Sequence, residues 1–265
     1  MIIIGEKING SVPPVAAAIQ RRDEALIRNL ALRQTEMGAD YLDVAAGSSP
    51  ETEREILEWL INIVQDTVET PVCIDSPDPR VLVDMLAIAK KPGILNSVSE
   101  EHGKCETVFP KIADTEWKVI ALTCGNNGIS SDAAARFNIA AAIIEKAEKY
   151  GIARNRLFID PLITALCANA NSLPDFTSAL SMIKKQYPDV HVTGGISNSS
   201  FGMPCRRLIN QQFLTLAMAA GMDSAITDPV SINIRSALYA VEALLGRDRN
   251  CRSFLNAFRK GLIRK

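Results

Sequence analysis

Short apolar runs alternate with amphipathic or alanine- and leucine-rich runs eight times along this chain of 265 residues, and this alternation restricts its fold. Continuous apolar runs, unlike runs in which every second residue is polar, are typical of parallel strands that are buried on both faces. We expect the strands at residues 2–6, 41–46, 71–76, 93–98, 118–123, 157–161, 191–197 and 224–228.

Eight strand–helix units of near-even spacing predict an α/β fold in which the strands close into a (β/α)8 TIM barrel. An open, doubly wound sheet is the competing architecture, and the even spacing favours closure. Proline and glycine lie at the strand–helix junctions, and no low-complexity stretch divides the chain into halves. Residues 1–265 are therefore expected to form a single domain.

The runs between the expected strands have the period of amphipathic helices. Between residues 51 and 68, apolar side chains recur at spacings of three and four, namely Ile56, Trp59, Leu60, Ile63 and Val64. This spacing places them on one helical face, which we expect to pack against the barrel.

Composition and charge exclude several classes of protein. The chain is 47% hydrophobic with a formal net charge of -1, so we expect an ordinary globular protein that does not bind nucleic acid. The apolar start at residues 1–4 is too short for a signal peptide, and no run approaches a membrane span. Six scattered cysteines and two histidines indicate reduced thiols without a zinc site. We therefore expect a cytoplasmic protein that needs no membrane and no metal ion of its own.

Polar residues end nearly every expected strand. In a barrel these carboxyl-terminal ends meet at one mouth, where active sites of this fold lie. Any single one of these residues could simply cap a helix or begin a turn. That explanation is weaker for a set whose members would converge on one cavity. The residues are Glu6, Asn9, Asp43, Asp75, Asn96, Ser97, Thr123, Asp160, Ser197, Asn198 and Asp228.

A mouth of this composition suits a neutral heterocycle better than a phosphate. A carboxylate can accept two parallel N–H bonds from a 2-amino-4-oxo-pyrimidine edge, and an amide can both donate and accept. A phosphate site is less favoured, because Gly194 and Gly195 lead into Ser197 and Asn198 without a lysine or arginine directly after them.

The ordered set of motifs resembles the methyltetrahydrofolate:corrinoid protein methyltransferases of the pterin-binding barrel superfamily. The match runs in register from residue 1 to about residue 257. Each motif alone is weak, and only their order is specific. The motifs are MIIIGEKIN at residues 1–9, IDS at 74–76, NS at 96–97, LT at 122–123, IDPL at 159–162, SN at 197–198 and LIN at 208–210.

The resemblance implies roles for particular residues. Asp75, Asn96 and Asp160 correspond to the group that hydrogen-bonds the pterin ring. Asn198 corresponds to the asparagine that contacts N5, where the methyl group is transferred, and is the expected catalytic residue. Arg206 matches a basic position near the folate tail. The expected pterin site also includes Glu6, Asn9, Asp43 and Ser97, from the same strand ends.

The resemblance also implies cofactors and partners. The substrate would be tetrahydrofolate or 5-methyltetrahydrofolate, and the methyl group would pass between N5 and the cobalt of a cobalamin. That corrinoid would come free or on a separate corrinoid protein, and the enzyme would be a homodimer.

Two positions depart from better-known members of the family. Ala45 replaces an asparagine, and Phe201 stands where a glutamine-like residue can contact the pterin. The run from Ser200 to Pro204 resembles the branch in which a methyl-corrinoid donates its methyl group to tetrahydrofolate, so we expect that direction.

Two other functions remain open from the sequence. Dihydropteroate synthase uses the same barrel, but it typically has Ser-Arg-Lys after the seventh strand, where this chain has Ser197, Asn198 and Ser199. A non-catalytic folate- or corrinoid-binding protein is the alternative from another class, since it would bind both molecules without transferring the methyl group.

Overall fold

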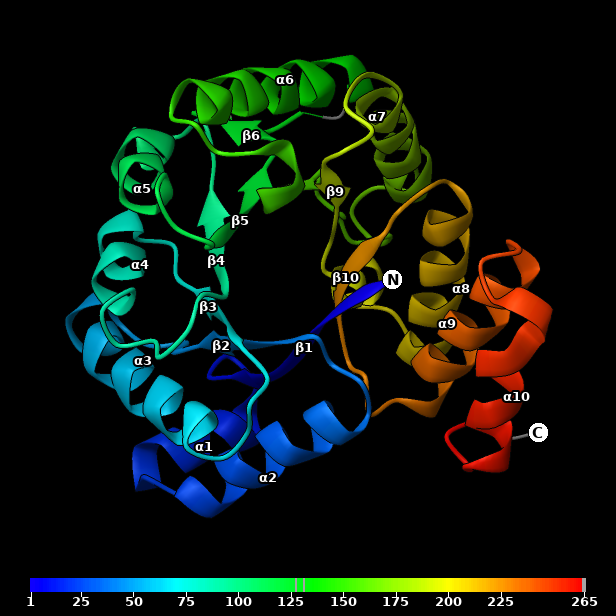
Figure 1. Cartoon of the computed structure of the whole chain (residues 1–265), viewed down its shortest axis with the longest axis horizontal. Coiled ribbons are helices and arrows are strands. Elements are labelled where there is room, and N and C mark those ends of the chain that lie inside the picture. Colours follow the sequence, from blue (N-terminus) through cyan, green and yellow to red (C-terminus); the bar gives the residue numbers. More distant parts are fainter. Residues whose placement is uncertain (127, 131, 264–265) are drawn as a thin grey trace.

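The computed structural model describes residues 1–126, 128–130 and 132–263. Its centre is an eight-stranded parallel sheet in the order β10-β1-β2-β3-β4-β5-β8-β9. The strands are β1 Ile2–Asn9, β2 Tyr41–Ala45, β3 Val72–Asp75, β4 Ile94–Val98, β5 Lys118–Leu122, β8 Leu157–Asp160, β9 His191–Val192 and β10 Ser224–Thr227. Past the end of β9, Gly194 accepts a hydrogen bond from the Ile226 amide at 3.1 Å and Gly195 bridges to Ile226, which closes the circle. The expected (β/α)8 barrel is confirmed (Figure 1).

Helices surround the barrel (Figure 1). Several begin where the sequence provides a start: Pro13, Pro50 and Pro79 occupy first helical positions, and the Asp132 carboxylate accepts from two amides of α6. The helices are α1 Pro13–Arg21, α2 Glu24–Glu36, α3 Pro50–Gln65, α4 Pro79–Met85, α5 Lys104–Ile112, α6 Ala133–Lys149, α7 Ser172–Gln186, α8 Arg206–Ala219, α9 Ile232–Leu244 and α10 Arg252–Arg259. Short 3-10 turns are η1 Arg154–Arg156, η2 Ile196–Ser200 and η3 Arg249–Cys251, and a small hairpin joins β6 Cys124–Gly125 to β7 Gly128–Ile129.

The apolar face of α3 contains the expected residues and is wider than expected, because Leu57 and Ile61 are buried as well. Leu57, Leu60, Ile61 and Val64 are completely buried, whereas the expected Ile56 and Trp59 are only half-buried at the edge of that face. The Trp59 ring instead lies beneath the guanidinium of Arg22, 4.9 Å from its centroid. Leu60, Ile63 and Val64 of the expected face are buried, and Ile56 and Trp59 pack against the core from its edge, so the prediction of this amphipathic helix is confirmed.

The seventh strand is the largest departure from the expected elements. The sequence predicted a strand over residues 191–197, but β9 contains only His191 and Val192. After the barrel-closing contact at Gly195 the chain turns into the 3-10 helix η2. The turn sets Ser197 and Asn198 on a compact loop above the sheet rather than within it.

The strands bury two separate apolar cores. One face of each strand packs against the helices in a large core that includes Leu42, Ile74 and Leu95. The other face fills the barrel interior. We call this second set the interior core, and it consists of Ile4, Cys73, Ile94, Ile120 and Phe158. No helix among the described residues is long and apolar enough to cross a membrane.

Candidate active site

The side chains at the barrel mouth form one layer above the interior core. Because side chains alternate along a strand, the residue two positions after an interior residue also points inward, one layer nearer the carboxyl end. The residues two positions after Ile4, Cys73, Ile94 and Phe158, and after Tyr41 and Ile226, which pack against the interior core, are all polar. We call this set the polar layer, and it consists of Glu6, Asp43, Asp75, Asn96, Asp160 and Asp228.

One half of the polar layer is built on β2, β3 and β4. The Asn96 amide donates to Asp43 at 3.2 Å, and Asp75 pairs with Asn96 in the register of the two strands. Burial raises the pKa of Asp43 to about 6 and raises the pKa of Asp75 well above its usual range, the latter with help from the charges of Asp43 and Glu53. No hydrogen bond or ion pair engages the Asp75 carboxylate among the described residues.

The other half centres on Asp160 at the end of β8. One carboxylate oxygen accepts from the Leu162 amide at 2.7 Å, and burial raises the pKa of the group to about 7. Beside it, the amide of Thr123 donates to the Asp160 carbonyl, and the buried Thr123 hydroxyl has no partner among the described residues. On β5 the inward position is Leu122, which packs on the interior core and adds an apolar wall to this side.

The loop η2 borders the mouth between β9 and β10. The Ser197 hydroxyl donates to Glu6 at 2.7 Å, and burial raises the pKa of that glutamate. Asn198 follows directly and is exposed, with its side chain folded over Gly195. Beside this loop, Lys7 pairs with Asp228 at 3.1 Å.

Three expected site residues have other contacts. The Asn9 side chain accepts a hydrogen bond from the Ser11 amide at 2.8 Å. This contact forms a turn, which is the alternative role stated above for polar residues at strand ends. The Arg206 guanidinium binds the Ser200 hydroxyl at 3.0 Å and the Ser197 carbonyl at 2.9 Å, so it supports η2 from outside. Ser97 is half-buried beside an irregularity in the β4–β5 pairing. The roles expected for these three remain predictions.

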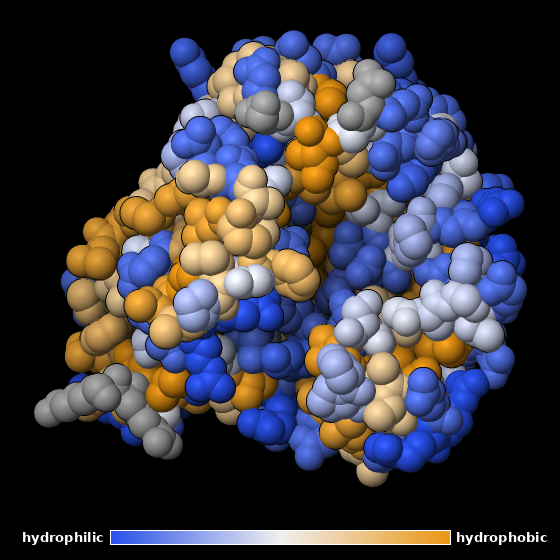
Figure 2. Space-filling view, turned by 180° about the vertical axis from the view of Figure 1, so that it is seen from behind, coloured by the Kyte–Doolittle hydropathy of each residue, from blue (hydrophilic) through white to orange (hydrophobic). Residues whose placement is uncertain are grey.

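The mouth is hollowed and hydrophilic. Figure 2, the view from the carboxyl ends of the strands, shows a central depression with hydrophilic side chains on its floor and apolar side chains around parts of its edge. The acceptors of Asp75 and Asp160 leave hydrogen-bonding capacity for a ligand rich in N–H donors. Among the described residues, no group of His, Cys, Asp or Glu has an arrangement that could hold a metal ion.

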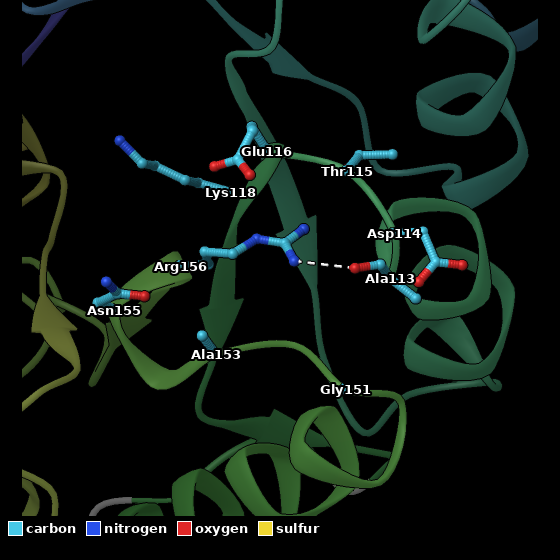
Figure 3. Close-up of a pocket in the computed structure, with 9 residues that line it drawn as sticks. All are labelled: Ala113, Asp114, Thr115, Glu116, Lys118, Gly151, Ala153, Asn155 and Arg156. Atoms are coloured by element: carbon cyan, nitrogen blue, oxygen red, sulfur yellow. Dashed lines mark hydrogen bonds between the residues drawn. The ribbon is translucent and has the colours of Figure 1, made fainter.

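A second cavity of about 450 Å³ lies at the opposite end of the barrel, where β5 and β8 begin (Figure 3). Its lining includes Lys118 and Arg156, but both are engaged by the protein. The Lys118 ammonium lies 2.5 Å from the Tyr41 hydroxyl, and Arg156 donates to the carbonyls of Trp117, Ala113 and Ile112. Both cations that line this cavity are therefore already bonded within the protein.

Comparisons with known proteins agree with this geometry. A family model described as pterin binding enzyme matches residues 15–228. The chain is 47% identical to the methylcorrinoid:tetrahydrofolate methyltransferase of Eubacterium limosum, over 99% of this chain and 98% of that protein. It is 28% identical to methionine synthase of Mycobacterium tuberculosis over 85% of the chain, which corresponds to only 20% of that longer enzyme.

Among solved structures, a dihydropteroate synthase from Xanthomonas albilineans superposes with a TM-score of 0.70, covering 92% of each chain at 23% identity. At this identity the likeness concerns the fold alone.

Proposed function

Because the chain belongs to the family of pterin-binding enzymes, we propose that it is a methyltransferase that moves a methyl group from a methyl-corrinoid to N5 of tetrahydrofolate. The expected family is confirmed, and the name of the relative from Eubacterium limosum agrees with the expected direction. The observation that carries the proposal is the polar layer, since its carboxyl groups and its amide gather at one mouth, and only Asp228 among them forms an ion pair within the described residues.

The polar layer suits the pyrimidine edge of a pterin. That edge presents an N–H and an exocyclic amino group side by side, and an ionised carboxylate accepts both in parallel. Asp160 and Asp75 supply such carboxylates, and the amide of Asn96 can serve a ring carbonyl or nitrogen. Leu122 offers an apolar surface to the flat ring. In this arrangement Asp75, Asn96 and Asp160 fix the ring, and the remaining polar residues support them.

In this proposal Asn198 acts at N5 rather than at the pyrimidine edge. It lies on η2, across the mouth from β3 and β4, and its neighbour Ser197 donates a hydrogen bond to Glu6. An uncharged amide can accept from the N5 hydrogen before transfer and donate to the N5 lone pair after it. When bound, the corrinoid supplies an electrophilic methyl group. The chain's part is to hold N5 in line with that group and to let the N5 proton leave to water.

The corrinoid fits the outer edge of the mouth better than its floor. The loops that follow β1, β5 and β9 expose the apolar side chains of Val12, Ile129 and Phe201, the last with 67% of its surface accessible. A macrocycle on a separate corrinoid protein, or free cobalamin, would meet these side chains before it reached the pterin. Phe201 in place of a glutamine makes this edge less polar at a point beside Asn198.

The region after β9 argues against dihydropteroate synthase activity. That reaction needs cationic groups near a pterin diphosphate and an aminobenzoate. Here the positions hold Ser197, Asn198 and Ser199, and Ser199 is buried and donates to the Ile196 carbonyl. Arg206 is the nearest cation along the chain, and its guanidinium is bonded to η2 itself.

We also propose a cytoplasmic homodimer. All six cysteines are free thiols, which is consistent with a reducing compartment. Large apolar side chains are exposed along α8, α9 and α10, and a second copy would cover such a surface. They are Leu208, Leu216, Ile232, Leu244, Leu245, Leu255 and Phe258.

One incubation tests the proposed reaction. The pure protein is mixed with methylcobalamin and tetrahydrofolate without oxygen, and the products are followed by absorbance and chromatography. We expect cob(I)alamin and 5-methyltetrahydrofolate in equal amounts, whereas a non-catalytic carrier would bind both reactants and form neither product. If cob(I)alamin fails to appear with methylcobalamin and also with a methylated corrinoid protein, the proposed function is wrong.

A further inference from the structure

A completely buried arginine lies beneath the loop that follows Asp160. Arg136, in the first turn of α6, has 1% of its surface exposed. Its guanidinium donates to the Pro161 carbonyl at 2.9 Å, the Leu162 carbonyl at 3.0 Å and the Ser130 carbonyl at 2.7 Å. A single charged group therefore joins the loop after β8 to the segment that precedes α6.

The loop held by Arg136 has an unfavourable backbone conformation. Leu162 has a φ of 69°, in the left-handed region that side chains other than glycine seldom adopt and that costs conformational energy. In this conformation the Leu162 amide points at Asp160 and donates to its carboxylate at 2.7 Å. The conformation that orients Asp160 is thus one that the loop would not favour on its own.

We propose that Arg136 is a positioning residue for pterin binding, which holds the turn at Leu162 so that the Asp160 carboxylate faces the mouth. This inference rests on the proposed function for its ligand, but its structural part concerns the chain alone. Arg136 touches no substrate. It acts through two carbonyls of the loop, and the loop acts through the Leu162 amide.

Electrostatics strengthens the same link. Burial raises the pKa of Asp160, and the positive charge of Arg136 opposes that rise. The charged groups near this arginine are Asp160 itself and Asp175 of α7. Since a pterin edge needs the ionised carboxylate as its acceptor, Arg136 favours the form of Asp160 that binds.

The chain contains a matched control for this role. Arg156 likewise gives its guanidinium to three backbone carbonyls, at distances of 2.6 to 3.1 Å, but it stabilises the end of α5 at the far end of the barrel (Figure 3). Loss of either arginine should destabilise the protein, because buried carbonyls lose their donors. Only the loss of Arg136 should alter the mouth.

The experiment compares Arg136→Met, Arg136→Lys and Arg156→Met with the wild type, all as full chains. Tetrahydrofolate binding is measured by calorimetry from pH 6 to pH 8, and amide hydrogen exchange at Leu162 is measured without ligand. We expect Arg136→Met to raise the dissociation constant by about tenfold or more, to move its acid limb to higher pH and to remove protection at Leu162. Arg136→Lys should restore the pH profile but only part of the affinity, and Arg156→Met should bind like the wild type.

Two results would overturn the inference. In the first, Leu162 exchanges as slowly in the Arg136 variants as in the wild type. In the second, Arg136→Met and Arg156→Met change the dissociation constant equally. If Arg136→Met does not fold, the exchange at Leu162 and the dissociation constant are measured on Arg136→Lys instead, and the same two results would overturn the inference. A wild type that binds no folate would instead contradict the proposed function, and the exchange at Leu162 would still test the positioning.

Discussion

At the scale of single residues, the candidate site combines acids whose pKa values burial raises, and the charges of nearby cations only partly oppose that rise. Such groups destabilise the free protein once they ionise, which indicates that they are kept for binding. Asp160 shows this most clearly, since burial raises its pKa to about 7.

The raised pKa of Asp160 predicts how the unfolding free energy depends on pH. A carboxyl with a raised pKa in the folded state stabilises the protein below its ordinary pKa of 3.8, and this contribution is lost as pH rises through about 7. Asp160→Asn cannot ionise, so its unfolding free energy should exceed that of the wild type increasingly from pH 4 to pH 8. The gain should reach at most about 4 kcal/mol. Urea unfolding across this range measures it, and a difference independent of pH would contradict the raised pKa.

Substitutions of the residues assigned to pterin binding should affect folate affinity, whereas substitution of Asn198 should mainly affect the rate of methyl transfer. Asp75→Ala and Asp160→Ala each remove a charged acceptor for the pterin edge and should weaken tetrahydrofolate binding by about 1.5–3 kcal/mol. Asn198→Ala should slow methyl transfer with a smaller loss of binding, because Asn198 is assigned to N5. Single-turnover rates and calorimetry on the three variants check this. Unchanged turnover in Asn198→Ala would remove its assigned role.

The sequence predicted the members of the polar layer but not their partners. Asp75, Asn96 and Asp160 were identifiable because each ends an apolar run. Each also lies two positions after a residue that faces the barrel interior, so its side chain points inward as well. Arg136 was missed, because an arginine in the first turn of a helix is not a favoured placement and its buried contacts are with distant backbone carbonyls. No local pattern encodes such contacts.

At the scale of elements, the 3-10 helix η2 replaces the expected end of the seventh strand and carries Asn198. Sequence patterns identified an apolar run there, but after the bridge from Gly195 to Ile226 the chain turns into η2. A side chain at Gly194 would meet Ile163 at 2.8 Å, so glycine is required there by close packing with a residue that is distant in the sequence.

Gly195 offers a test confined to this element. A Cβ at this position would lie 3.0 Å from the Asn198 amide nitrogen, so Gly195→Ala should displace that side chain and little else. We expect a fall in kcat of about tenfold with a nearly unchanged KM for tetrahydrofolate. Gly125→Ala is the control, since its Cβ would meet nothing within 4 Å. Equal kinetics in both alanine variants would show that the position of Asn198 does not limit the reaction.

At the scale of the whole molecule, the even spacing of eight units predicted closure, and the register of β1 through β10 shows it. The same closure explains why residues as far apart as Glu6 and Ser197 meet at one mouth. Association between two copies of the chain is harder to predict from the sequence than the fold is. Helical periodicity does not distinguish an apolar face that packs against the barrel from one that a second copy covers.

The exposed apolar surface of α9 and α10 leads to a prediction about assembly. Leu244 has 83% of its surface exposed, and Leu255 and Phe258 are also exposed. The double variant Leu244→Glu, Leu255→Glu should sediment as a monomer where the wild type sediments as a dimer, with folate binding retained. Leu32→Glu, on exposed α2, should leave the association unchanged. A monomeric wild type would contradict the proposed assembly.

The polar layer as a pterin site is tested most directly by calorimetric titration of tetrahydrofolate into the wild type and into Asp75→Ala, Asn96→Ala and Asp160→Ala. Asp114→Ala, at the cavity on the opposite end of the barrel, serves as the control. We predict one folate bound per wild-type and control chain, and weaker binding in each of the three variants. Absence of folate uptake by the wild type, or equal affinity in all five proteins, would contradict the account.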